Sequence, residues 1–231
     1  MNDQETTPSR GVLLKGIIFC LLLFLAVMLF YGLLVKPLKL PPTVYYYISR
    51  FLFWICLGIL FIYVAKVERQ PFLVWPTPKQ PFGFYVLSFI AIMCILFFGS
   101  IIITLILKLS GANTRSPVME HIIAIFRQYR LLMVFTCVTA GIVEELVFRG
   151  YLQTRLQALV KKPYLAIIIS ALLFGGFHFG YGTIGNVIVP FFIGAVFATY
   201  YYLYRNIWVL MFCHFLWDLL LLLVATSNYK H

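Results

Sequence analysis

Residues 131–151 read LLMVFTCVTAGIVEELVFRGY, and this stretch decides the fold. Its length matches the roughly 20 residues that a helix needs to cross a bilayer. The run nevertheless contains Glu144, Glu145 and Arg149. Each charge buried in a membrane span costs at least ~2.5–3.5 kcal/mol, so charges at this depth require pairing, a water-filled cavity or both. We therefore expect a membrane helix that forms part of a functional site.

The composition of the whole chain indicates a membrane protein. Of its 231 residues, 63% are hydrophobic and 11% are charged, whereas about 25% are charged in soluble domains. No water-soluble fold of this length hides so much apolar side chain, so lipid must be the main solvent. The cysteines lie in apolar runs without a CxxC pair and are predicted to be small buried hydrophobes. They are Cys20, Cys56, Cys94, Cys137 and Cys213.

Seven apolar runs have the length of a membrane span. They cover residues 12–35, 44–67, 83–109, 131–151, 163–179, 187–204 and 207–226. Residues 118–130 differ, because apolar side chains recur there at helical spacing with charges on other faces. That pattern is typical of an interfacial amphipathic helix. The sequence thus predicts an all-α fold, a polytopic transmembrane helical bundle of about seven spans.

The charge pattern predicts contact with lipid rather than with nucleic acid. The net charge is +11, and basic residues cluster at the ends of the apolar runs, as in proteins that orient against anionic lipid. The loop at 155–162 is basic and the loop at 180–186 is uncharged. This predicts that the loop at 155–162 is cytoplasmic and the loop at 180–186 is external. The N-terminus would then lie inside and the C-terminus outside. Arg115, Arg127 and Arg130 oppose this orientation, and a re-entrant or additional span would remove the conflict.

Helical periodicity separates the two adjacent glutamates. Glu145 and Arg149 are four residues apart, so they share a helix face and can form an ion pair. Glu144 points about 100° away from that face and has no partner on its own helix. We expect Glu145 and Arg149 to lock the helix, and Glu144 to face groups from other helices.

Further polar side chains occur in the later spans. Phe174 and His178 are spaced by four residues, with two glycines between them that permit close approach of another backbone. His214 and Asp218 have the same spacing, so Asp218 could orient His214 or both could face a common centre. Acids and imidazoles on three spans predict a shared polar interior, suited to a general base with water or to a metal.

Together these residues resemble a known family. Residues 144–149 fit the pattern EExxxR, residues 174–178 fit FxxxH, and residues 214–218 fit HxxxN/D. In this order on successive apolar helices, they resemble the CPBP family of CAAX proteases and bacteriocin-processing enzymes, also called the Abi or Rce1-like family. The resemblance covers residues 131–226. It implies a four-helix catalytic core there, preceded by N-terminal spans and the interfacial helix in residues 1–130.

The resemblance implies an intramembrane endopeptidase, a peptide hydrolase whose partners are the bilayer and a membrane-associated peptide or protein. Glu144 would activate a water that His178 helps to hold, while His214 and Asp218 would bind the scissile carbonyl or its oxyanion. The expected catalytic residues are Glu144, His178, His214 and Asp218, supported by Glu145, Arg149 and Phe174. We expect this site near the cytoplasmic ends of the fourth to seventh spans.

Asp218 departs from the eukaryotic enzymes of the family, which have Asn at this position. Asn donates a hydrogen bond to an oxyanion, and an ionised Asp does not. Asp218 would then be protonated, orient His214 or ligate a metal. Two histidines and two carboxylates also suit zinc or another divalent metal, whose ligands would be Glu144, His178, His214 and Asp218. The chain lacks HExxH, which excludes an ordinary zincin.

Two other classes of function are compatible with the buried acids and histidines. One is a non-catalytic bacteriocin-immunity or scaffold protein that kept the fold. The other is a proton-coupled transporter, which the lack of an inverted repeat disfavours. The short chain predicts a bacterial cytoplasmic membrane as the location. Bacteria generally lack prenylated CAAX proteins, so CAAX cleavage itself is not expected.

Overall fold

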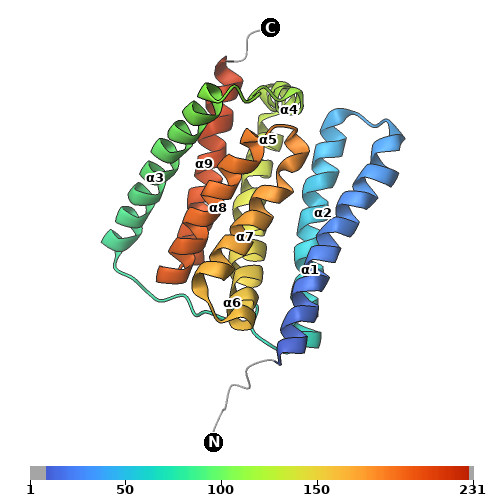
Figure 1. Ribbon diagram of the computed structural model, residues 1–231. Coiled ribbons are helices and arrows are strands. Elements are labelled where there is room, and N and C mark those ends of the chain that lie inside the picture. The colour runs from blue at the N-terminus through green and yellow to red at the C-terminus, as the bar shows by residue number, and fades with distance from the viewer. Residues whose placement is uncertain (1–8, 229–231) are drawn as a thin grey trace, which may run out of the picture.

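The computed structural model describes residues 9–228, and every regular element in that range is a helix (Figure 1). Seven helices there are long and apolar enough to cross a membrane. They are Arg10–Leu38, Pro42–Glu68, Phe82–Leu109, Arg130–Val160, Pro163–Tyr181, Gly185–Tyr204 and Ile207–Asn228. The predicted all-α bundle is therefore confirmed. Residues 1–8 of the predicted N-terminal part lie outside the described residues.

The α-helices are α1 (Arg10–Phe30), α2 (Pro42–Tyr63), α3 (Phe82–Leu109), α4 (Pro117–Gln128), α5 (Arg130–Thr139), α6 (Thr154–Val160), α7 (Pro163–Phe177), α8 (Gly185–Tyr204) and α9 (Ile207–Asn228). Turns of π- or 3₁₀-helix extend or join them: η1 (Tyr31–Val35), η2 (Lys36–Leu38), η3 (Val64–Glu68), η4 (Ala140–Glu144), η5 (Leu146–Gln153) and η6 (Phe179–Tyr181). Proline opens α2, α4 and α7, where its missing amide hydrogen leaves no donor unpaired.

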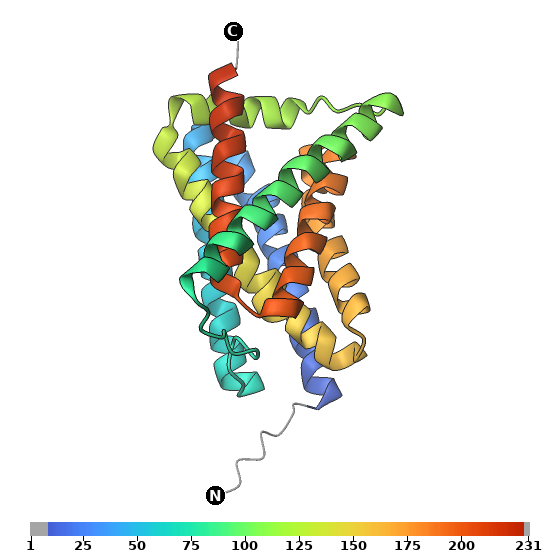
Figure 2. The ribbon, with the colours of Figure 1, turned by 90° about the vertical axis from the view of Figure 1, so that its left-hand side faces the viewer.

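The predicted amphipathic helix is α4, and it lies across one end of the bundle (Figure 2). It buries Ile122, Ile125 and Phe126 against the spans. The start of α1 and the end of α9 lie at opposite ends of the bundle, and α4 lies at the end where α9 finishes (Figures 1 and 2). Within residues 9–228, no further helix meets the criteria for a span, so a missed span does not resolve the position of Arg115, Arg127 and Arg130.

The fourth span is longer than predicted and changes its winding at the glutamates. It runs unbroken from Arg130 to Val160, and the wide π-helical turns η4 and η5 flank Glu145. π-helical turns inside α-helices occur mostly at functional sites. They change the angular register of the side chains along the helix, and a periodicity of 3.6 residues does not predict them.

A buried ion pair ties this span to the N-terminal helices. Arg155 Nη2 donates to Glu68 Oε2 at 2.9 Å, and the Tyr151 hydroxyl donates to the other carboxylate oxygen. Both charged side chains are almost fully buried. Arg155 is therefore not one of the charges of a basic cytoplasmic loop, and this part of the prediction is wrong. Of that loop's cations, only Lys161 and Lys162 are exposed, which weakens the predicted orientation.

Glycines allow the close helix contacts around the fourth span. A Cβ added to Gly141 would lie 2.7 Å from the Met211 carbonyl oxygen of α9. A Cβ at Gly175 would lie 2.8 Å from the Val187 carbonyl oxygen of α8. The predicted close approach at residues 174–178 is thus made at Gly175, whereas a Cβ added to Gly176 would meet no other element within 4 Å.

Candidate active site

The two adjacent glutamates lie in different surroundings. Glu145 is fully buried, and its Oε1 accepts a hydrogen bond from Arg149 Nη1 at 2.8 Å. The predicted i, i+4 ion pair is therefore present. The same oxygen accepts a second hydrogen bond from His214 Nδ1, also at 2.8 Å. Glu145 thus joins the fourth span to the seventh.

Aromatic rings and a carbonyl enclose the Arg149 cation. Its guanidinium lies 4.4 Å from the ring centroid of Phe174 and 5.3 Å from that of Phe197. Nη2 also donates to the Gly194 carbonyl oxygen at 3.3 Å. Cation–π contacts strengthen when they are removed from water, so this pocket compensates part of the desolvation of a buried arginine. Phe174, predicted as support for the site, contacts Arg149 directly.

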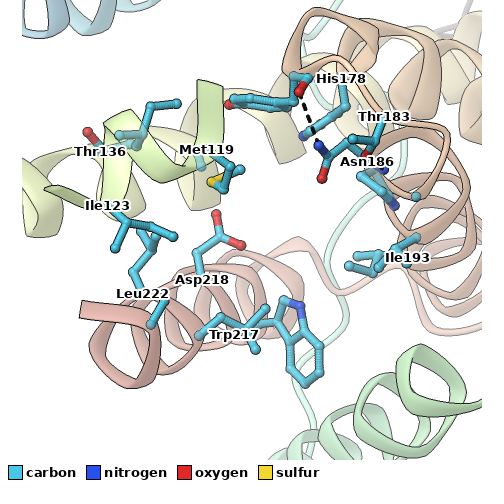
Figure 3. A pocket seen from close by; sticks show the side chains of 18 of the residues that line it. Met119, Ile123, Thr136, His178, Thr183, Asn186, Ile193, Trp217, Asp218 and Leu222 are labelled. Atoms are coloured by element: carbon cyan, nitrogen blue, oxygen red, sulfur yellow. Dashed lines mark hydrogen bonds between the residues drawn. The ribbon is translucent and has the colours of Figure 1, made fainter. Parts of the chain in front are cut away.

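The four predicted catalytic side chains line one cavity of about 510 Å³. Glu144 reaches it from the fourth span, His178 from the end of α7, and His214 and Asp218 from α9. Figure 3 shows Asp218 and His178 on different walls of this cavity. The structure brings these side chains together, and their catalytic roles remain predictions.

Among the described residues, Glu144 and His178 each have a polar atom that lacks a hydrogen-bond partner, and both side chains line the cavity. No hydrogen bond to the Glu144 carboxylate occurs within residues 9–228, in contrast to the two accepted by Glu145. His178 Nδ1 lies 2.8 Å from the Phe174 carbonyl oxygen. A carbonyl oxygen only accepts, so Nδ1 carries the hydrogen and the neutral ring has Nε2 as an acceptor. A free carboxylate and a free imidazole nitrogen are each able to accept a hydrogen bond from water.

His214 is oriented by Glu145 and not by Asp218. Its Nδ1 donates to Glu145, whereas its Nε2 lies 3.6 Å from Asp218 Oδ2, within ion-pair range but beyond a hydrogen bond. Of the two predicted arrangements, His214 and Asp218 therefore adopt the one in which both face a common centre. The contact between Glu145 and His214 was missed, because it joins residues 69 positions apart and helical spacing reports only on neighbours.

The donor set does not form a compact metal site in the described part of the chain. No three His, Cys, Asp or Glu side chains among residues 9–228 are grouped closely enough to hold one ion. Glu145, which contacts His214, is already committed to Arg149. Zinc or another divalent metal therefore stays a prediction, and no chemical step is derived through it.

The cavity lies toward the α4 end of the bundle. Its walls include Met119 and Phe126 of α4 and Asn186 at the start of α8. The predicted loop at 155–162 lies at the other end, where the structure has most of α6 and the two residues that connect it to α7 (Figure 1). From the sequence, this loop is expected in the cytoplasm and the site near the cytoplasmic ends of the spans. The two expectations contradict each other, because site and loop lie toward opposite ends.

Fold and site define a class of protein: a multi-pass helical membrane protein with an acid–histidine cavity among its spans. Residues 126–220 match the family model described as type II CAAX prenyl endopeptidase Rce1-like. Residues 126–220 therefore form a domain of the Rce1-like type, also named CPBP, which is a family of proteases. The predicted resemblance is confirmed, and the matched residues include all four cavity side chains. No curated protein and no solved structure matches the chain.

Proposed function

We propose that the chain is an intramembrane endopeptidase that hydrolyses a peptide bond of a membrane-associated protein or peptide, with Glu144 activating the attacking water. The observation that carries this proposal is the free Glu144 carboxylate in a cavity shared with His178 and His214. Membership in a protease family supports a protein substrate. A cavity among membrane spans suits a substrate that arrives from the lipid.

The proposed reaction is a general-base hydrolysis. Water held between Glu144 and His178 Nε2 gives a proton to Glu144, and its oxygen bonds to the scissile carbonyl carbon. The tetrahedral intermediate then collapses, the C–N bond breaks, and Glu144 passes the proton to the leaving nitrogen. With both ring nitrogens protonated, His214 donates from Nε2 to the oxyanion while Glu145 holds Nδ1.

Asp218 is proposed to act beside His214. Its carboxylate lies 3.6 Å from His214 Nε2, so an ionised Asp218 would pair with the imidazolium form of the ring. A protonated Asp218 would instead donate to the oxyanion, as the related Asn does.

We further propose residues 131–226 as the catalytic core, residues 1–130 as its N-terminal part, and the bacterial cytoplasmic membrane as the location.

The test compares the wild-type protein with Glu144→Gln against peptides of the host membrane, with new peptide termini identified by mass spectrometry. We expect cleavage to fall by at least ~100-fold, since general-base catalysis contributes about 10²–10⁴-fold, while the variant still inserts and accumulates. Glu120→Gln is the matched control, because Glu120 of α4 pairs with Arg115, which precedes that helix, and neither residue lines the cavity. Full cleavage by Glu144→Gln would refute the mechanism. Cleavage by neither protein would favour the immunity or scaffold alternative.

A separate measurement addresses the metal. Elemental analysis of the purified protein, with cleavage assayed before and after chelation, distinguishes the two mechanisms. Active protein without bound metal supports direct activation of water by Glu144. Loss of cleavage on chelation and recovery with added zinc would replace that mechanism.

A further inference from the structure

An arginine lines the same cavity as the proposed catalytic groups. Arg50 belongs to α2, is half-buried, and reaches the cavity from the N-terminal part of the chain. Tyr46, one helical turn nearer the start of α2, also lines the cavity and packs against Phe126 of α4, with ring centroids 6.1 Å apart. Arg50 therefore lies one turn deeper in the bundle than the contact that joins α2 to α4.

Arg50 has no acidic partner within residues 9–228. The ion pairs there join Glu68 to Arg155, Glu120 to Arg115, Glu145 to Arg149 and His214, and Asp218 to His214. Arg50 Nε donates to Ser49 Oγ at 3.3 Å, and its guanidinium lies 5.0 Å from the ring centroid of Phe53. These contacts leave both Nη groups without a hydrogen-bond acceptor among the described residues.

An unpaired cation at this position is costly unless something binds to it. An ionisable side chain inside a membrane span is normally paired or directed to a cavity that serves function. Arg149 and Arg155 follow the first pattern, each with a buried carboxylate. Arg50 follows the second pattern. Apart from two tyrosines, the other ionisable groups of its cavity are the carboxylates of Glu144 and Asp218 and two histidines. An incoming anion is therefore attracted to the α2 wall and repelled by the carboxylates.

We propose that Arg50 binds a carboxylate of the peptide substrate while Glu144 acts on the scissile bond. The planar guanidinium fork matches a carboxylate with two parallel hydrogen bonds. The remaining lining is largely apolar, with Met119, Ile123 and Ile193 among its side chains, and suits the apolar side chains of the same peptide. This inference rests on the proposed function. It adds that the site selects peptides that carry a negatively charged carboxylate together with apolar side chains.

Equilibrium binding tests the proposal without requiring hydrolysis. The probes are N-dodecanoyl-leucyl-leucine with a free carboxylate and the same compound as its carboxamide, added to the full-length protein in maltoside micelles. Trp217 lines the cavity, so its fluorescence reports occupancy. We expect the carboxylate to bind about tenfold more tightly than the amide, because hydrogen bonds to a charged group contribute that much. In Arg50→Gln the two probes should bind equally.

Two further variants serve as controls for the binding experiment. Arg205→Gln is the matched control, because Arg205 also stacks on an aromatic ring, 5.6 Å from the Trp75 centroid, but does not line the cavity. It should keep the wild-type preference. Arg50→Lys keeps the charge without the guanidinium fork and should retain a smaller preference for the carboxylate probe. This variant tests the proposal if Arg50→Gln fails to fold.

Three outcomes would overturn the proposal: equal binding of both probes by the wild-type protein, an unchanged preference in Arg50→Gln, or Arg50-dependent binding of dodecyl phosphate that exceeds binding of the acyl dipeptide. The last would assign Arg50 to an anionic lipid headgroup. The binding assay does not require hydrolysis, so failure here leaves the hydrolytic proposal standing. Loss of hydrolysis alone leaves the anion site standing.

Discussion

Replacing Glu145 with Gln should destabilise the protein far more than the same change at Glu144. Glu145 is fully buried and accepts 2.8 Å hydrogen bonds from Arg149 and His214. Gln keeps the shape and removes the charge, which leaves the Arg149 guanidinium buried without an anion. Breaking a buried ion pair in this way costs about 3–5 kcal/mol. Glu145 Oε2 has no hydrogen-bond partner among the described residues, so the new amide group gains no bond there.

The assay is unfolding of the purified protein by sodium dodecyl sulfate in mixed micelles, which yields a free energy of unfolding for each variant. Glu144→Gln is the matched control, because it makes the same chemical change one residue away. Its carboxylate faces the cavity without a hydrogen-bond partner in residues 9–228, so we expect a change below about 1 kcal/mol. The reasoning is refuted if the two variants lose the same stability, or if Glu145→Gln unfolds like the wild type.

Two further predictions concern the packing of the spans. Glu68→Gln should lower the free energy of unfolding by about 3 kcal/mol, since it leaves the buried Arg155 unpaired, and adding Arg155→Met should recover part of the loss. If the double variant were less stable than both the wild type and Glu68→Gln, this explanation would be contradicted. Gly141→Ala should cost about 1–3 kcal/mol, because its Cβ would lie 2.7 Å from a carbonyl oxygen of α9. Gly58→Ala meets no atom within 4 Å and should be neutral or slightly stabilising, so equal effects at both glycines would exclude the steric explanation.

Local patterns predicted the features that depend on neighbouring residues. Hydropathy located the seven spans, because a helix in lipid must satisfy its own backbone over a fixed length. A spacing of four residues predicted the pair of Glu145 and Arg149, since both belong to one helix. The order of three short motifs identified the family. None of these inferences needed the arrangement of the helices.

The features that the sequence did not predict all depend on contacts between helices. Arg155 seemed to be a loop cation, and only the packing of η3 against the fourth span reveals its buried partner Glu68. Arg50 carries no motif, and its role as part of the cavity wall depends on how α2 packs beside the fourth span. His214 is held by a residue of another span. An i, i+4 spacing correctly suggested Asp218 as its neighbour but could not rank that contact against a residue from elsewhere in the chain.

The contacts of the fourth span suggest why one glutamate is fixed so that its neighbour can stay free. Glu145 neutralises Arg149 and orients His214, while Gly141, one turn earlier, brings the span against the α9 backbone. The proposed base and the contacts that position the proposed oxyanion group therefore belong to one continuous helix. A shift of this helix along α9 would carry Glu144 with it and break the His214 hydrogen bond at the same time. We therefore expect substitutions at Gly141 to reduce cleavage through the position of His214, even where the Glu144 carboxylate is untouched.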